Sequence, residues 1–249
     1  MALQEEIEEQ GMWLFKYRGV LPLILLASGL IVLVWNTLHP GFLNESPLFE
    51  VAWPYICFAV GVLGMVIRAY TVGHTPANTS GRNTEEQVAD ELNTTGIYSM
   101  VRHPLYVGNF FMWLPFALLT GNLWFSFSFV LVYWLYYERI MFAEEQFLRR
   151  KFGDRYTSWA ETLPAFIPSF KNYKKPSLPF SWKKVLKKEK NSLASLFLLF
   201  SLFDILRATI LGSATYNMFF LYGAIATLVL YFVLKYMKYN TELLNEEGR

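Results

Sequence analysis

Apolar residues gather in six blocks along the chain, and short polar segments separate them. Each block approaches the roughly 20 apolar residues that an α-helix needs to cross about 30 Å of hydrocarbon. Gly, Pro, Asn or charged residues interrupt the pattern between the blocks. The pattern predicts six membrane-spanning helices, over residues 20–38, 51–70, 105–120, 123–142, 193–211 and 216–237.

The links between the blocks predict how the helices pair. Only Gly121 and Asn122 separate the third block from the fourth, and residues 212–215 separate the fifth from the sixth. Links this short are typical of antiparallel helical hairpins. Composition points to the same class, because 54% of the residues are hydrophobic and 17% are charged, against about 25% charged residues in soluble domains. We therefore expect an all-α, polytopic integral membrane helical bundle.

The distribution of positive charge predicts the orientation of this bundle. Lys and Arg are absent from residues 39–50, 121–122 and 212–215, whereas 12 of the 22 lie within residues 144–192. Since Lys and Arg of short loops stay on the cytoplasmic side, we expect both termini to be cytoplasmic. An acidic segment precedes the first block and no clear cleavage site follows it, which favours a retained helix. The expected location is a bacterial inner membrane or the endoplasmic reticulum.

Three regions follow from these boundaries: N-terminal membrane helices over residues 1–70, a polar-rich core over 71–170, and a basic linker with a C-terminal hairpin over 171–249. The basic run 183–190 is expected to contact anionic lipid headgroups. Asp204 and Arg207 are expected to pair with each other, the alternative being a lateral opening for substrate. The net charge of +2 gives no indication of nucleic-acid binding. Cys57, the sole cysteine, is expected to be buried, so no disulfide and no metal site are predicted.

The most informative polar cluster stands at the start of the third block, where residues 95–108 read TGIYSMVRHPLYVG. Ionisable side chains are costly to place at the edge of a membrane helix, so a functional site is the default interpretation. Alternatively, Arg102 and His103 are a cytoplasmic anchor, Pro104 starts the helix, and the tyrosines belong to an interfacial belt.

A second polar cluster closes the fourth block, where residues 137–156 read YERIMFAEEQFLRRKFGDRY. The pattern predicts a helix that leaves the membrane and ends at Gly153. With 3.6 residues per turn, Glu144 and Glu145 point in different directions and need not share one role. Tyr156 and Trp159 are expected to be interfacial anchors. Taken alone, this segment indicates only a solvated helix end.

The ordered set of both clusters resembles the isoprenylcysteine carboxyl methyltransferases, whose superfamily includes the phospholipid methyltransferases. The resemblance covers roughly residues 94–168, and residues 1–70 match only as hydrophobic helices. It implies a helical membrane fold with a cytoplasm-facing pocket for S-adenosylmethionine, which a lipid substrate enters from the bilayer. The implied cofactor-binding residues are Tyr98, His103, Pro104, Tyr106, Gly108, Glu144 and Glu145.

The implied catalytic residues are Arg102, Glu145 and Arg139, and the choice among Glu138, Glu144 and Glu145 as the cofactor contact stays open. These residue types suit the chemistry. Methyl transfer to an anionic oxygen demands positioning and exclusion of water more than a base. Tyrosine faces suit a cation, a carboxylate pairs with an amino group, and Arg orients a phosphate or carboxylate.

The acceptor is expected to be a membrane lipid or a lipidated substrate, without an obligate protein partner. Arg82, Asn83 and Arg139 are candidate substrate contacts, although the composition of residues 73–83 favours a plain polar loop over this interpretation. The C-terminal helices beyond the family core and the Arg-rich surface favour O-methylation of a lipid phosphate of the lipid A type. The alternative is an isoprenylcysteine carboxyl O-methyltransferase or a phospholipid N-methyltransferase.

Two other classes remain open. Sterol reductases that use NADPH carry a related Arg-His segment, but they are much longer and have more helices. A non-catalytic membrane scaffold would bind no cofactor and would tolerate a change of His103.

Overall fold

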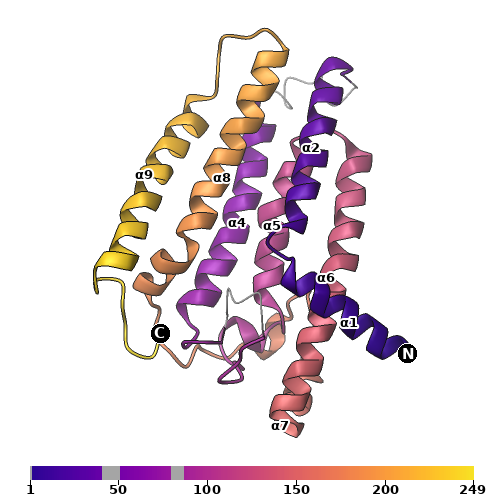
Figure 1. Ribbon diagram of the computed structural model, residues 1–249, viewed down its shortest axis with the longest axis vertical. Helices are drawn as coiled ribbons and strands as arrows, with labels where there is room; N and C mark the ends of the chain where they lie inside the picture. Colours follow the sequence, from indigo (N-terminus) through magenta and orange to yellow (C-terminus); the bar gives the residue numbers. More distant parts are fainter. Residues whose placement is uncertain (1, 41–50, 80–86) are drawn as a thin grey trace.

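The computed structural model describes residues 2–40, 51–79 and 87–249. This part of the chain forms an all-helical bundle, whose long helices stand side by side in Figure 1. It contains no β-strand, only an isolated bridge between Gly96 and Lys174. In chain order the elements are α1 (Leu3–Lys16), α2 (Leu21–Leu38), α4 (Trp53–Gly73), the 3₁₀ helix η1 (Ile97–Ser99), α5 (Pro104–Leu118), α6 (Leu123–Phe152), α7 (Asp154–Ala160), η2 (Phe170–Asn172), α8 (Trp182–Ile210) and α9 (Met218–Asn240).

The six apolar blocks correspond to α2, α4, α5, α6, α8 and α9, so the prediction of an all-α bundle is confirmed. Among the described residues, α4, α8 and α9 are long and apolar enough to cross a membrane. The apolar stretches of α2 and α5 are shorter. The count of six spans and the cytoplasmic location of both termini stay predictions.

Local sequence signals account for the helix ends. Pro22 and Pro54 lie in the first turns of α2 and α4, where a missing backbone N–H costs nothing. The side chain of Asn122 accepts the backbone N–H of Phe125 at 2.9 Å and caps α6. Gly153 follows α6 with a φ of 54°, which a residue with a side chain rarely adopts. The predicted end of this helix is confirmed.

The helices α4 and α5 approach one another at two glycines. A Cβ atom on Gly64 would lie 2.5 Å from the carbonyl oxygen of Gly108, too close for any side chain. Around this contact, Phe116, Phe200 and Phe220 fill the core between α5, α8 and α9. Cys57 is fully buried in the same core, as expected. The two glycines therefore hold α4 and α5 at a short, fixed separation.

Helix α1 lies outside the six blocks and crosses α6 in Figure 1. Its Gly11 is the contact point, since a Cβ atom there would lie 2.1 Å from the carbonyl oxygen of Arg139. Phe15, one turn further on, is buried against α6. The rest of its surface carries exposed polar and apolar side chains, among them Glu5, Met12 and Trp13, a mixture that suits a membrane interface.

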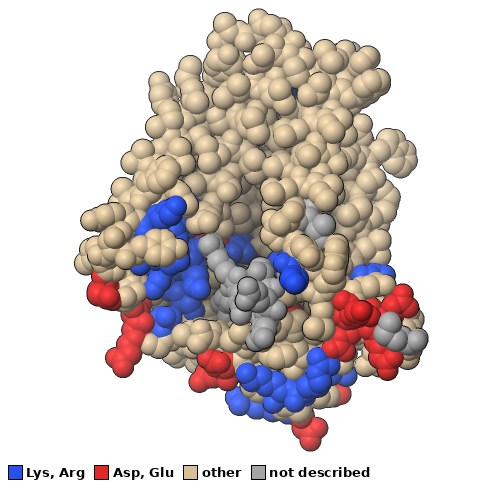
Figure 2. Space-filling view, in the orientation of Figure 1, with Lys and Arg blue, Asp and Glu red and all other residues tan. Residues whose placement is uncertain are grey.

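Charged side chains gather at one end of the bundle, and the other end is almost free of them on the face shown in Figure 2. Both ends of the described chain lie at this charged end. Asp204 is near the opposite end, where its carboxylate accepts the backbone N–H of Asn217 at 2.7 Å and so connects α8 to the start of α9. The expected pairing of Asp204 with Arg207 stays a prediction.

Candidate active site

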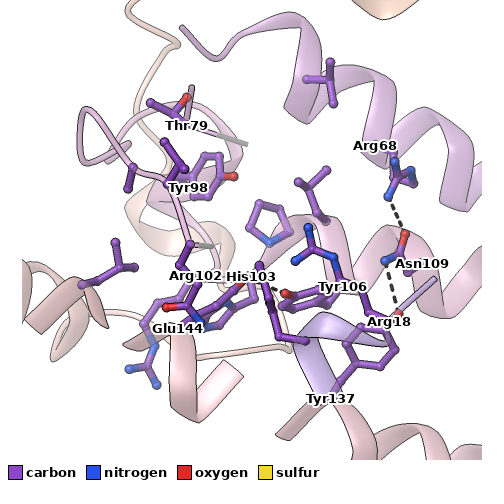
Figure 3. A pocket seen from close by; sticks show the side chains of 18 of the residues that line it. Arg18, Arg68, Thr79, Tyr98, Arg102, His103, Tyr106, Asn109, Tyr137 and Glu144 are labelled. Atoms are coloured by element: carbon purple, nitrogen blue, oxygen red, sulfur yellow. Dashed lines mark hydrogen bonds and ion pairs between the residues drawn. The ribbon is translucent and has the colours of Figure 1, made fainter. Parts of the chain in front are cut away.

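A cavity of about 380 Å³ opens among the helices at the charged end of the bundle. The hollow is visible in Figure 2, and Figure 3 shows the side chains that surround it. Its walls come from the end of α1, from α4, the segment before α5, the first turns of α5, the outer half of α6, α7 and α8. Residues separated by most of the chain therefore share one site.

The Arg-His-Pro segment is held in place by backbone contacts with the segment after α7. The N–H groups of Arg102 and His103 donate to the carbonyls of Pro164 and Ala165 at 3.0 and 3.2 Å. Pro104 then occupies the first turn of α5, and His103 precedes it with an extended φ of −121°. This geometry directs the side chains of Arg102 and His103 toward α6.

His103 lies between two carboxylates of α6. Its Nε2 atom is 3.0 Å from Oε1 of Glu145, and its Nδ1 atom is 3.4 Å from Oε2 of Glu144. Arg102 adds a second contact to Glu145, at 3.0 Å. Because His103 is 6% exposed, this is a charged cluster largely removed from water. The two adjacent carboxylates, expected to point apart, both reach the same ring.

The cluster shifts the pKa of both partners. Burial lowers the pKa of His103, but hydrogen bonds and charge from Glu144 and Glu145 outweigh burial and raise it above 6.5. Burial raises the pKa of Glu145, but the hydrogen bond from His103 and the charges of His103 and Arg102 outweigh it and lower that pKa. The site is therefore built to hold a protonated His103 beside ionised Glu145.

Glu144 is the carboxylate that faces the cavity. It lines the wall, and it accepts the hydroxyl hydrogen of Tyr106 at 2.6 Å. Tyr98, labelled in Figure 3, also lines the cavity, and burial followed by the charge of Glu144 raises its pKa. An anion among neutral phenols is a site for a cationic ligand.

Two buried donors in the cavity wall have no hydrogen-bond partner among the described residues. They are the amide of Gln87 and the indole N–H of Trp159, whereas the Tyr156 hydroxyl is within hydrogen-bonding reach of the Arg102 side chain. Both Gln87 and Trp159 line the cavity. Buried polar groups are nearly always paired in folded proteins, so donors that converge on one cavity indicate a ligand rich in acceptor atoms.

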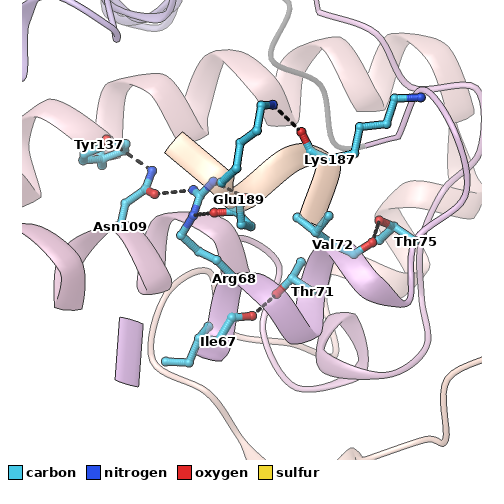
Figure 4. Close-up of polar contacts among 10 residues, drawn as sticks. Ile67, Arg68, Thr71, Val72, Thr75, Asn109, Tyr137, Lys187 and Glu189 are labelled. Atoms are coloured by element: carbon cyan, nitrogen blue, oxygen red, sulfur yellow. Dashed lines mark hydrogen bonds and ion pairs between the residues drawn. The ribbon is translucent and has the colours of Figure 1, made fainter. Parts of the chain in front are cut away.

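A second polar network closes the inner end of the cavity. Arg68 of α4 donates to both oxygens of Glu189 of α8, at 2.9 and 2.7 Å, and also to the amide oxygen of Asn109. The Asn109 amide in turn donates to the hydroxyl of Tyr137 at 3.5 Å, as Figure 4 shows. All four residues line the cavity.

Sequence reasoning missed this network. The available signals were Arg68 inside an apolar block and Glu189 within a basic run, both of which are unusual positions for an unpaired charge. Nothing in the sequence pattern indicated that the two residues meet.

Comparison with known proteins supports the resemblance to membrane methyltransferases. The model of a family described as phospholipid methyltransferase matches residues 50–155. The protein-S-isoprenylcysteine O-methyltransferase of Schizosaccharomyces pombe is 29% identical over 163 residues, which cover 63% of this chain and 66% of that protein. The probable protein-S-isoprenylcysteine O-methyltransferase of Oryza sativa subsp. indica is 29% identical over 160 residues, 61% of this chain and 82% of that protein.

The chain is similar to members of the isoprenylcysteine and phospholipid methyltransferase superfamily. Its relatives include the nickel-cobalt-cadmium resistance protein NccN of Alcaligenes xylosoxydans xylosoxydans, 33% identical over 120 residues, 47% of this chain and 53% of that protein. The chain thus spans about half to two thirds of the length of several such relatives. No solved structure matches it significantly.

The region that matches the superfamily, residues 50–155, contains α4, α5 and α6. These helices supply the Arg-His-Pro segment, Glu144 and Glu145, and the inner-end residues Arg68 and Asn109. Helices α8 and α9 lie beyond the match, yet α8 closes the cavity with Glu189. Tyr156 also follows the match; it is fully buried in the cavity wall, so its expected role as an interfacial anchor is wrong.

The structure brings most of the expected superfamily residues together. Those that line the cavity are Tyr98, Arg102, His103, Pro104, Tyr106 and Glu144. Glu145 lies behind His103 and Arg102 rather than in the wall. Gly108 contacts Gly64 and Arg68 on α4, so the close backbone approach it allows is to a helix.

The remaining expected site residues are elsewhere. Arg139 lies outside the cavity, where its Nε donates to Gln10 of α1 at 2.9 Å and Glu138 is its neighbour at 3.9 Å. The turn of α6 that carries Arg139 faces α1, which accounts for this position. Arg82 and Asn83 lie outside the described residues.

Proposed function

We propose that this chain is an integral-membrane methyltransferase that uses S-adenosylmethionine and modifies an anionic, lipid-like acceptor. The observation that carries the proposal is the convergence of two unpaired buried donors, on Gln87 and Trp159, and the carboxylate of Glu144 on one cavity. A ligand with a positive charge and many acceptor atoms matches that wall.

S-adenosylmethionine has these properties, and the residues present fit it. Glu144 would pair with its amino group, the faces of Tyr98 and Tyr106 would meet its positive charge, and the unpaired donors of Gln87 and Trp159 would meet its heteroatoms. When bound, it supplies a methyl group on a sulfonium: the acceptor oxygen forms the new bond to carbon, the carbon–sulfur bond breaks, and its electron pair stays on sulfur.

The protein's own residues position the reactants and keep water away. His103, fixed between Glu144 and Glu145, holds the Glu144 carboxylate at the cavity wall, and Arg102 neutralises Glu145. An acceptor that arrives as an anion carries no proton to remove, so no residue of the site has to act as a base.

An apolar groove gives the acceptor a route from the bilayer. It encloses about 310 Å³, and Trp13, Pro22, Leu25 and Trp113 are among its residues. Tyr137 lines both the groove and the polar cavity, so the two spaces adjoin. A molecule with an apolar chain and a polar head matches this pair of sites.

The names of the relatives favour an isoprenylcysteine carboxylate as the acceptor. The lipid A type phosphate that the Arg-rich surface suggested receives no support from these comparisons. The orientation with the charged end in the cytoplasm is part of the proposal, because positive residues of short loops stay on that side.

Calorimetry on the detergent-purified protein tests the proposal. We expect saturable binding of S-adenosylmethionine and S-adenosylhomocysteine, and none of NADPH. Glu144→Gln and Trp159→Phe should weaken binding by about tenfold, the effect of one charged or buried hydrogen bond.

Matched controls are Glu161→Gln and Trp182→Phe, which change exposed residues outside the cavity. A folded wild-type protein that binds neither methyl-donor ligand would refute the proposal, and binding of NADPH in their place would favour the reductase alternative.

A further inference from the structure

The inner end of the cavity holds an arginine that the proposed cofactor site does not use. Arg68 has 15% of its side chain exposed, and its partner Glu189 has 6%. A charge this close to membrane depth is costly unless it has a role, and it is rarely left without a partner. The question is what the guanidinium does beyond pairing with Glu189.

The contacts of Arg68 leave part of its binding capacity available. A guanidinium carries five N–H donors. Two of them meet Glu189 and one meets Asn109, and among the described residues the other two have no protein partner. Because Arg68 lines the cavity, a ligand inside it can reach those two donors.

The Arg68 network and the residues of the proposed cofactor site lie at different positions along the helices. Asn109 follows Tyr106 by almost one turn of α5, and Tyr137 precedes Glu144 by about two turns of α6. Both displacements lead away from the charged end and toward the bilayer. The Arg68 network therefore lies deeper than His103, Tyr106 and Glu144.

The apolar groove meets the cavity at the same depth. Tyr137 is shared by both spaces, and its hydroxyl accepts from Asn109, the neighbour of Arg68. An acceptor that enters with its chain along the groove would present its head to Arg68. A water-soluble ligand entering from the charged end would first meet Glu144, a carboxylate that repels anions.

We propose that Arg68 binds the anionic head of the membrane-embedded acceptor, and that Glu189 and Asn109 position its guanidinium for this contact. This inference rests on the proposed function, and it adds the C-terminal hairpin to the functional unit. Arg68 is an acceptor-binding residue, and Glu189 is a positioning residue that acts through it. The carboxylate of Glu189 fixes the plane of the guanidinium, which presents its remaining donors in a fork.

The arrangement suits methyl transfer to oxygen. Paired donors keep the acceptor ionised and fix one oxygen relative to the methyl donor. The Glu189 carboxylate offsets the charge of Arg68, so this pair is close to neutral before the acceptor arrives. The same donors would accommodate a carboxylate or a phosphate, and the test below separates the two.

Binding of three farnesyl compounds to the full-length protein in detergent tests this inference: N-acetyl-S-farnesylcysteine, its uncharged carboxamide, and farnesyl phosphate. We expect Arg68→Lys to weaken binding of the preferred anionic compound by about tenfold to a hundredfold. The carboxamide should bind the variant within about twofold of wild type. Glu189→Gln should also weaken binding of the anionic compound, but by a smaller factor than Arg68→Lys. Glu189→Asp, which keeps the carboxylate, should retain part of the affinity that Glu189→Gln loses.

The surface pair of Arg150 and Glu8, also 2.7 Å apart, supplies matched controls. Arg150→Lys and Glu8→Gln should leave all three affinities unchanged. Preference of the wild type for the carboxylate or for the phosphate identifies the chemistry of the acceptor head.

Several results would overturn the inference. In the first, Arg68→Lys weakens binding of the acid and of the carboxamide equally, as a purely structural role predicts. In the second, Arg68→Lys leaves the affinity for the acid unchanged. In the third, the wild type binds neither anionic compound. Loss of S-adenosylhomocysteine binding in Arg68→Lys would assign the arginine to the cofactor instead. Absence of cofactor binding in the wild type refutes the proposed function separately, because the acceptor measurements do not depend on it.

Discussion

His103 and Glu145 face each other at 3.0 Å in a part of the protein that is largely closed to water. Arg102 contacts the other oxygen of the same carboxylate. This carboxylate therefore joins the loop before α5 to the outer half of α6. Removing it would leave Arg102 without its anion and His103 with Glu144 as its one remaining carboxylate partner among the described residues.

We expect Glu145→Ala to destabilise the protein by about 3 kcal/mol, since a partly buried charge pair is broken on one side only. The measurement is thermal unfolding in detergent. The control is Glu161→Ala, an exposed residue, which should shift the melting temperature little. Equal melting temperatures of the two variants would show that the cluster contributes nothing to stability.

The same pair predicts a pH dependence. The pKa of His103 is raised in the folded protein, so its stabilising contribution is complete below the reference value of 6.5 and is lost as the pH rises through the raised pKa. The pKa of Glu145 is lowered, so its contribution is present above 4.5 and is lost as the pH falls through the lowered value. The melting temperature of the wild type should therefore decline above pH 6.5, and that of His103→Gln should decline less. If the melting temperatures of the wild type and of His103→Gln declined equally with rising pH, His103 would not be the group responsible.

The glycine contact between α4 and α5 predicts a second stability effect. Gly64→Ala places a methyl group 2.5 Å from a backbone oxygen, and we expect it to cost about 1–3 kcal/mol. Gly29→Ala is the matched control inside a helix, because its new methyl group would meet Phe125 at 3.5 Å and the Phe116 carbonyl oxygen at 3.9 Å, both ordinary contact distances. If Gly64→Ala left the stability unchanged, the two helices would be able to move apart without destabilising the protein.

The orientation is testable with single cysteines. Cys57 is fully buried, so it should not react with a membrane-impermeant maleimide in the folded protein. Lys175→Cys and Ala214→Cys introduce thiols at exposed positions before and after α8, and therefore toward opposite ends of that helix. In intact cells we expect only the cysteine at 214 to be labelled from outside. Labelling at 175 instead would reverse the proposed orientation.

The sequence predicted the helices well because hydrophobic blocks interrupted by Gly, Pro and Asn are a local signal. Asn122 and Gly153 mark the limits of α6 through their own side-chain and backbone preferences. The segment around His103 was identified for a similar reason, since polar residues at a membrane boundary are conspicuous.

The parts that sequence reasoning missed depend on contacts between distant segments. Helix α1 carries four Glu residues and lies outside the apolar blocks, yet Gly11 docks it on α6 and directs Arg139 away from the cavity. Tyr156 has the composition of an interfacial anchor, but the short helix α7 turns it inward. The pairing of Arg68 with Glu189 spans 121 positions, for which periodicity carries no information.

That separation also has a consequence for biogenesis. At roughly 5–20 residues per second, a ribosome that has added Arg68 needs about 6 to 24 s to add the next 121 residues, the last of which is Glu189. During this interval the guanidinium of α4 must be met by water or by lipid phosphates, because its carboxylate has not yet been synthesised. Insertion of α8 would then let Glu189 replace those temporary partners of Arg68. We therefore expect α4 to reach its final position only when the site is completed, late in translation.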